Sequence, residues 1–162
     1  MKGKIICKTI EGGEKEINIK KLSFRPSVYG VLIENNKVLL SGQWDGYDFP
    51  GGGIEINETV SEALEREFFE ETGTKIKKDK IIACESSFSI LPFSQKPINS
   101  ILIYFLCNKL GGKLSLKNIS KDESQYINMP EWVSLDKIDK LKFYNSIDSV
   151  KLIRKACKLS GA

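Results

Sequence analysis

The distribution of apolar and polar residues along the chain predicts a series of short β-strands. The expected strands cover residues 4–10, 16–22, 27–34, 37–42, 81–90 and 98–106. The first two should pair as a hairpin across residues 11–14, and the next two as a hairpin that turns at Asn35-Asn36. Loops are expected at 92–97 and 121–130, and a turn at Gly111-Gly112.

Two other segments repeat apolar residues at helical spacing, which predicts amphipathic helices at 59–73 and 146–158. The apolar stripes consist of Val60, Ala63, Leu64 and Phe68 in the first helix and of Ile147, Val150, Ile153 and Cys157 in the second. Thr59 and Glu62 form a capping-box pattern at the start of the first helix, and Gly73 suits the position after its end. Strands mixed with two helices favour an α/β sandwich.

Glutamates crowd the first helix, which follows a glycine turn at 51–53. At about 100° per residue, Glu67 and Glu71 fall within the apolar stripe and Glu70 borders it. Glu62 and Glu65 should face water, as the glutamates of a surface helix usually do. Carboxylates beside the core repel one another and lose hydration unless a positive charge compensates. Because hard cations take carboxylate oxygens, the pattern indicates a bound divalent cation.

The same stretch resembles the signature of the Nudix hydrolase family, G-x5-E-x7-R-E-U-x-E-E-x-G-U, in which U is a bulky aliphatic residue. The fixed positions are matched by Gly52, Glu58, Arg66, Glu67, Glu70, Glu71 and Gly73. Phe68 takes the first U position, and Thr74 departs from the last one, where packing rather than chemistry is affected. The segments 49–52 and 131–135 also look like the family.

The resemblance implies the Nudix α-β-α sandwich with a mixed sheet. We expect residues 1–22 to form an N-terminal β-hairpin extension and residues 23–162 to form the Nudix hydrolase domain around the signature at 52–74. The resemblance further implies a pyrophosphohydrolase that cleaves a nucleoside diphosphate linked to another moiety. A nucleoside triphosphate, as in MutT-like enzymes, is the default substrate. ADP-ribose or a nucleotide sugar is the alternative.

The resemblance also assigns roles to individual residues. Mg²⁺, with Mn²⁺ as the alternative, would bind to Gly52, Glu58, Glu67, Glu70 and Glu71. Arg66 would orient a glutamate by a charge-assisted hydrogen bond.

The chain contains no histidine, so a carboxylate or a metal-bound hydroxide must act as the general base. Glu123 in the expected loop at 121–130 is one candidate for this base, followed by Glu131. Glu70 on the helix is an equal contender, so the choice stays open.

Several residues outside the signature are candidates for substrate contact. Arg25 could bind phosphate, and Tyr29, Trp44, Tyr47 and Phe49 could stack on a base. For aromatic residues beside strands, a place in the core is the competing interpretation. Trp44 and Tyr47 lie in a polar turn at 43–48, which favours substrate contact for these two.

Two rival functions belong to other classes. A Nudix module that senses a nucleotide without cleaving it typically lacks signature carboxylates, whereas this chain keeps them all. A structural domain with an acidic surface helix would not place glutamates on the inward stripe.

Composition agrees with a small enzyme of one domain. The chain has 162 residues, 41% of them hydrophobic, and a net charge of +4 without a basic block. These values suit an anionic small molecule and give no reason to expect nucleic acid as a partner. No stretch is long and apolar enough to span a membrane, and the first residues do not resemble a signal peptide. We therefore expect a cytoplasmic protein, for which a homodimer is compatible with the sequence.

The cysteines show no metal-type spacing and lie mainly in apolar runs, which predicts buried free thiols. They are Cys7, Cys84, Cys107 and Cys157.

Overall fold

The computed structural model describes residues 3–161, in which ten strands form one mixed sheet. The strands are β1 (Lys4–Lys8), β2 (Glu14–Asn18), β3 (Ser23–Phe24), β4 (Ser27–Glu34), β5 (Lys37–Gln43), β6 (Gly46–Asp48), β7 (Gly51–Gly53), β8 (Thr74–Ile90), β9 (Pro97–Gly112) and β10 (Ile127–Ser134). The main path of the sheet runs β10-β5-β4-β9-β8-β1-β2, while β3 pairs with β9, β6 with β5 and β7 with β4. The long antiparallel pair of β8 and β9 and the parallel pair of β4 and β9 form its centre.

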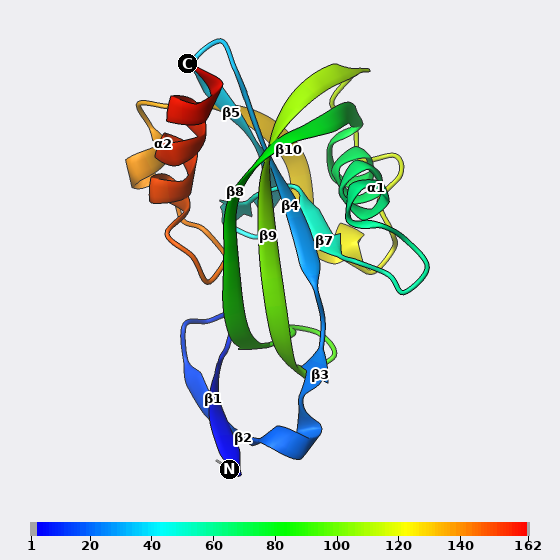
Figure 1. The fold of residues 1–162 in the computed structure, drawn as a ribbon, viewed down its shortest axis with the longest axis vertical. Coiled ribbons are helices and arrows are strands. Elements are labelled where there is room, and N and C mark those ends of the chain that lie inside the picture. The colour runs from blue at the N-terminus through cyan, green and yellow to red at the C-terminus, as the bar shows by residue number, and fades with distance from the viewer. Residues whose placement is uncertain (1–2, 162) are drawn as a thin grey trace.

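Two helices, α1 (Val60–Thr72) and α2 (Ser149–Ser160), lie on opposite sides of this sheet (Figure 1). Each helix covers its own hydrophobic cluster. Ala63, Leu64 and Phe68 of α1 pack in one cluster with residues of β4 and β5. Ile153 and Ala156 of α2 pack in the other cluster. The arrangement confirms the expected α-β-α sandwich.

The local signals around α1 are confirmed in detail. The Thr59 hydroxyl accepts a hydrogen bond from the Glu62 N–H, and the Glu62 carboxylate accepts one from the Thr59 N–H at 2.8 Å. Gly73 follows the helix with a φ of 69°, a left-handed conformation that glycine adopts without strain. The expected turn at Asn35 and Asn36 is also present, with φ angles of 50° and 59°.

Several expected boundaries were wrong, and pairing with neighbouring strands explains most of the errors. The strand expected at 16–22 ends at Asn18, where a 3₁₀ helix (Ile19–Lys21) begins. Strand β8 begins at Thr74 rather than Ile81, because its lysine-rich first half pairs with β9 through irregular register. For the same reason Gly111 and Gly112 end strand β9 instead of forming a turn.

Other expectations failed at loops and helix ends. The glycines at 51–53 form strand β7, which pairs with β4, rather than a turn. Helix α2 begins at Ser149, three residues later than expected. The segment 121–130 is not a single loop. It contains a short 3₁₀ helix, η2 (Glu123–Gln125), and then enters β10 at the buried residue Ile127.

All four cysteines are free thiols, as expected, but only two are fully buried. Cys7 and Cys107 are buried, Cys157 is partly buried, and Cys84 is exposed. Cys84 lies on β8, opposite Ile103 of β9.

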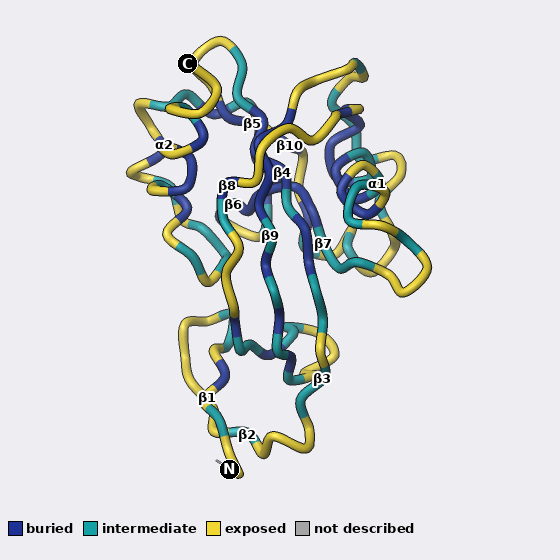
Figure 2. The backbone as a smooth tube through the Cα atoms, in the orientation of Figure 1, coloured by how far each residue is buried: buried dark blue, intermediate teal, exposed yellow. Residues whose placement is uncertain are grey.

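The N-terminal strands β1 and β2 form the expected hairpin, which extends from one end of the sheet (Figure 1). The hairpin is largely exposed (Figure 2), and it meets the rest of the sheet where Lys8 pairs in parallel with Ser89 of β8. A further 3₁₀ helix, η3 (Ile138–Lys140), leads toward α2. In residues 3–161, neither helix has the length and apolar character that a membrane span requires.

Candidate metal and substrate site

The centre of the site is a pair of buried carboxylates on α1. Glu67 and Glu71 are one turn apart and are 8% and 3% exposed. Burial raises the pKa of Glu67, and it raises the pKa of Glu71 well above its usual value. The charges of Glu67 and Asp48 act on Glu71 in the same direction. Within residues 3–161, the Glu71 Oε2 atom has no hydrogen-bond partner.

A third carboxylate reaches this pair from a distant part of the chain. One carboxylate oxygen each from Glu67, Glu71 and Glu123 lie within 4.8 Å of one another. Glu123 begins the short helix η2, and its Oε2 atom accepts a hydrogen bond of 2.6 Å from the Ser120 hydroxyl. Three converging carboxylates, one of them with an unsatisfied buried oxygen, fit the ligand preference of a hard divalent cation.

Arg66 contacts the signature carboxylates of Glu58 and Glu70 as well as that of Glu67. Its Nε and Nη2 atoms donate to the two Glu58 oxygens at 3.0 and 2.6 Å. Its Nη1 atom lies 2.8 Å from Glu67 Oε1 and 3.4 Å from Glu70 Oε2. The hydrogen bond from Arg66 lowers the pKa of Glu58. Glu58 and Glu70 are therefore paired with arginine and lie outside the three-carboxylate group.

Gly52 brings the backbone of β7 against the three-carboxylate group. A Cβ atom at this position would lie 2.6 Å from Glu67 Cδ, closer than van der Waals contact permits. The absence of a side chain thus lets the backbone and a carboxylate meet. This is the position at which the family resemblance implies a carbonyl ligand.

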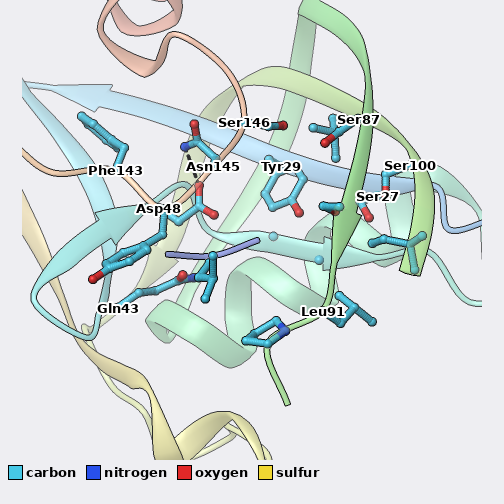
Figure 3. Close-up of a pocket in the computed structure, with 18 of the residues that line it drawn as sticks. Ser27, Tyr29, Gln43, Asp48, Ser87, Leu91, Ser100, Phe143, Asn145 and Ser146 are labelled. Carbon is cyan, nitrogen blue, oxygen red and sulfur yellow. Dashed lines mark hydrogen bonds between the residues drawn. The ribbon is translucent and has the colours of Figure 1, made fainter. Parts of the chain in front are cut away.

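Glu67, Glu71 and Glu123 line a cavity of about 450 Å³, and Figure 3 shows other residues of its wall. Arg25 lines this cavity, and its guanidinium forms no ion pair and no hydrogen bond within residues 3–161. The guanidinium lies over β7, because a Cβ atom on Gly53 would be 2.8 Å from Arg25 Nη2. A partly buried arginine without a carboxylate partner is suited to binding an anion.

Trp44 lies at the cavity in a cluster of aromatic rings. Its ring centroid is 5.0 Å from that of Tyr126, 4.8 Å from Tyr144 and 6.4 Å from Phe93. The Trp44 φ of 47° is unusual for a bulky residue, and such strain is concentrated at functional sites. Trp44 is 36% exposed, so ring surface remains for a ligand.

The structure separates the other predicted aromatic contacts. Tyr29 lines the cavity and stacks on Tyr104 with centroids 5.1 Å apart. Phe49 is 1% exposed and belongs to the core cluster under α2, so the predicted base contact has no ring surface to use. Tyr47 lies outside the cavity lining and donates its hydroxyl to Glu131. Glu131, the second candidate base, is thereby placed away from the acidic group.

Sequence reasoning did not find Asp48, which is buried and lines the cavity. Its Oδ1 atom accepts hydrogen bonds from the Phe49 N–H at 2.7 Å and from Asn145 Nδ2 at 2.9 Å. Burial raises the Asp48 pKa to about 6. The available signal was its place directly before the segment 49–52, which precedes the signature.

Comparisons with known proteins identify the family of the chain. The NUDIX domain model matches residues 23–155. The chain is 29% identical to the 8-oxo-dGTP diphosphatase of Buchnera aphidicola over 115 residues, which cover 64% of this chain and 82% of that protein. It is 29% identical to the ADP-ribose pyrophosphatase of Methanocaldococcus jannaschii over 148 residues, which cover 87% of this chain and 79% of that protein.

A solved structure shows the same fold. The crystal structure of an ADP-ribose pyrophosphatase from Streptococcus suis matches with a TM-score of 0.64 and 17% identity, covering 85% of this chain and 92% of that chain.

Proposed function

The chain belongs to the NUDIX family and hydrolyses a diphosphate bond, and from this premise we propose that Glu67, Glu71 and Glu123 hold the divalent cation of the reaction. The family match confirms the resemblance that the signature carries. The observation that supports this ligand set is the convergence of the three carboxylates within 4.8 Å. Mg²⁺ suits such oxygen ligands, and Mn²⁺ is the alternative.

When bound, the cation neutralises charge on the diphosphate and lowers the pKa of a coordinated water. The Gly52 carbonyl is an additional candidate ligand, because its strand lies against Glu67. Glu58 and Glu70 act through Arg66, whose contacts fix Glu67 in the direction of the site. Arg66 is therefore a positioning residue in this proposal.

The chain's own groups account for the proton balance. Water adds to a phosphorus atom, the bond from that phosphorus to the bridging oxygen breaks, and two phosphate-bearing products form. The water proton passes to a carboxylate, since the chain has no histidine. Glu123 is the proposed acceptor because a loop carries it to the acidic group. Glu70, which forms an ion pair with Arg66 at 3.4 Å, is the alternative.

Arg25 is the proposed anchor of the diphosphate. It lines the same cavity as Glu67 and Glu71, and no protein carboxylate neutralises it within residues 3–161. Trp44 is the proposed platform for the base. Nucleoside triphosphates remain the default substrate, supported by the similarity to a diphosphatase of 8-oxo-dGTP. ADP-ribose or a nucleotide sugar is the alternative, supported by the similarity to an ADP-ribose pyrophosphatase.

The retention of every signature carboxylate argues against a module that only senses nucleotides. Cytoplasmic location and homodimer formation stay predictions.

The decisive experiment compares Glu123→Gln with Glu131→Gln. Both change a glutamate of the same region, but Glu131 is bonded to Tyr47 outside the cavity. We expect Glu123→Gln to lower kcat by roughly 10²-fold and to weaken Mg²⁺ binding in calorimetry, and Glu131→Gln to change neither. Glu71→Gln should behave like Glu123→Gln. Full activity in excess EDTA, or wild-type kcat in Glu123→Gln, would contradict the proposal.

A further inference from the structure

The segment 116–126, which carries Glu123, has one hydrogen bond to a distant part of the chain. The Trp44 N–H donates to the Tyr126 carbonyl at 2.9 Å. The other hydrogen bonds of this segment within residues 3–161 join neighbours in the sequence, such as that from the Ser120 hydroxyl to Glu123. The contact with Trp44 is therefore the polar attachment of the segment that brings Glu123 to the site.

Tyr126 is coupled to Glu123 through a single helical turn. Its N–H donates to the Glu123 carbonyl at 3.0 Å, which closes the short helix η2. The two side chains also lie within electrostatic range, because burial raises the pKa of Tyr126 and the charge of Glu123 raises it further. A displacement of Tyr126 would therefore displace Glu123.

The Tyr126 ring adds a second contact with Trp44. The two rings are stacked, with centroids 5.0 Å apart and planes at 22°. Such offset stacking is a favoured arrangement of aromatic rings. The Tyr126 hydroxyl forms no hydrogen bond within residues 3–161, so the ring and the backbone make the attachment.

Trp44 is itself fixed from two directions. Its N–H is bonded to Tyr126, and its carbonyl accepts a hydrogen bond of 2.9 Å from Asn128 Nδ2. The Tyr144 ring contacts it from another segment, with centroids 4.8 Å apart. A φ of 47° persists at a bulky residue only where the surroundings hold it. Trp44 thus gives the segment of Glu123 a rigid support.

We propose that Tyr126 is a positioning residue, which holds the Glu123 carboxylate beside Glu67 and Glu71 through its stacking on Trp44. The inference rests on the proposed function, in which Glu123 binds the cation, and deepens it by naming the residue that places Glu123. Trp44 is also the proposed platform for the base. The base and the segment of Glu123 then share one support.

The test is a double-mutant cycle of Tyr126→Leu and Glu123→Gln in the full chain. It measures kcat and KM with dGTP or ADP-ribose, whichever the wild type hydrolyses faster, and Mg²⁺ affinity by calorimetry without substrate. Tyr126→Leu should lower kcat and Mg²⁺ affinity about ten-fold each, as the loss of a group that orients a metal ligand does. In the Glu123→Gln background the same change should alter both by less than about two-fold, because the carboxylate on which it acts is absent.

Two further variants separate the ring from other effects. Tyr126→Phe keeps the ring and should retain the kcat and Mg²⁺ affinity of wild type. Phe93→Leu is the matched control, because its ring contacts Tyr126 at 5.2 Å and Trp44 at 6.4 Å but belongs to the segment between β8 and β9. Phe93 does not line the cavity and is 56% exposed, so this variant should keep both kcat and Mg²⁺ affinity.

Trp44→Asn tests the same contact from its other side and serves if Tyr126→Leu does not fold. Asparagine accepts a positive φ more readily than other residues, so the ring is removed while the backbone can keep its hydrogen bonds. Without substrate, Mg²⁺ affinity should fall about as far as in Tyr126→Leu. Unchanged Mg²⁺ affinity in Trp44→Asn would overturn the inference.

Other outcomes also decide between the two proposals. Equal losses from Tyr126→Leu in both backgrounds would overturn the inference, since Tyr126 would then act independently of Glu123. A higher KM with unchanged kcat and Mg²⁺ affinity would overturn it too, because the ring would only contact substrate. A Tyr126→Phe variant as impaired as Tyr126→Leu would assign the effect to the hydroxyl instead. In contrast, wild-type kcat and Mg²⁺ affinity in Glu123→Gln alone would contradict the proposed function itself.

Discussion

At the scale of single residues, the site depends on carboxylates that the fold keeps from water. Glu67, Glu71 and Asp48 are each less than a tenth exposed, and burial raises the pKa of all three. Such groups cost folding free energy when they are ionised and lack a cation. A divalent cation at the proposed site would offset this cost.

Asp48 allows this cost to be measured. Its pKa is about 6 in the folded protein against 3.8 in the unfolded chain, so the native state binds more protons between these values. The free energy of unfolding should therefore fall as the pH rises through this window. Asp48→Asn keeps an oxygen acceptor for Phe49 and Asn145, and it should raise the free energy of unfolding at about pH 7.5 by on the order of 2 kcal/mol.

Urea unfolding in EDTA at about pH 4 and pH 7.5 tests this expectation. At about pH 4 most of the difference between the variant and wild type should be absent, because the Asp48 carboxyl is then protonated in the native state. Asp136→Asn is the control, because Asp136 is exposed and its pKa is lowered by the Ser134 hydroxyl rather than raised. If Asp48→Asn is instead less stable than wild type at neutral pH, the hydrogen bonds to the ionised Asp48 carboxylate stabilise the fold by more than its burial costs.

Sequence reasoning located the site residues of α1 but not the site residues that other elements contribute. The helical wheel predicted burial for Glu67 and Glu71, because local periodicity decides which face of a helix turns inward. Asp48 could not be found in this way, because its partner Asn145 is 97 positions away in the sequence. The same limit applies to Asn128, whose partner Trp44 is 84 positions away.

At the scale of elements, the site exists because strand β7 and helix α1 approach each other closely. The two glycines of β7 nearest the site contact different groups. A Cβ atom on Gly52 would lie 2.6 Å from the Glu67 carboxylate carbon, and one on Gly53 would lie 2.8 Å from the Arg25 guanidinium. Both obstacles are the ends of flexible side chains, which can move at small cost to stability.

We therefore expect Gly52→Ala and Gly53→Ala to separate metal binding from substrate binding. Gly52→Ala displaces Glu67 and should weaken Mg²⁺ binding about ten-fold or more, with a melting temperature near that of wild type. Gly53→Ala displaces Arg25 and should raise KM without changing Mg²⁺ affinity. Calorimetry with Mg²⁺ and steady-state kinetics measure the two effects. Equal effects of both variants on Mg²⁺ affinity would contradict this expectation, because the two glycines would then not act on metal binding and substrate binding separately.

Elements that are determined by local sequence signals were predictable, whereas elements that are determined by pairing between strands were not. The cap at Thr59 and the asparagine turn at 35–36 follow from side-chain and backbone preferences within a few residues. The first half of β8 is rich in lysine and reads as polar, but pairing with β9 makes it a strand. Residues 127–130 join β10 because β5 offers an edge to pair with, which no local pattern reveals.

At the scale of the whole molecule, the acidic group joins parts of the chain that are otherwise held separately. Glu67 and Glu71 belong to α1 on one side of the sheet, and Glu123 belongs to the segment before β10. A bound cation would therefore connect the helix to the loop that carries Glu123. Metal binding should add to the stability of the fold as well as to catalysis.

The last prediction concerns this linkage and its pH dependence. At about 100-fold excess over its dissociation constant, a ligand adds about 2.7 kcal/mol to the free energy of unfolding. For a chain of this length we expect saturating Mg²⁺ to raise the melting temperature by roughly 5–10 °C at about pH 8. Because the pKa values of Glu67 and Glu71 are raised, protons compete with the cation as the pH falls. The Mg²⁺-induced shift should therefore shrink toward about pH 5.

Glu71→Gln should lose the Mg²⁺-induced shift, and its melting temperature in EDTA should equal or exceed that of wild type, because a buried charge without a partner is removed. Glu65→Gln is the matched control, since Glu65 lies on the exposed face of the same helix and should retain the shift. Calorimetric melting of the three proteins at both pH values measures these effects. If Glu71→Gln instead melts well below wild type in EDTA, the Glu71 carboxylate stabilises the fold itself, and its burial no longer indicates a cation.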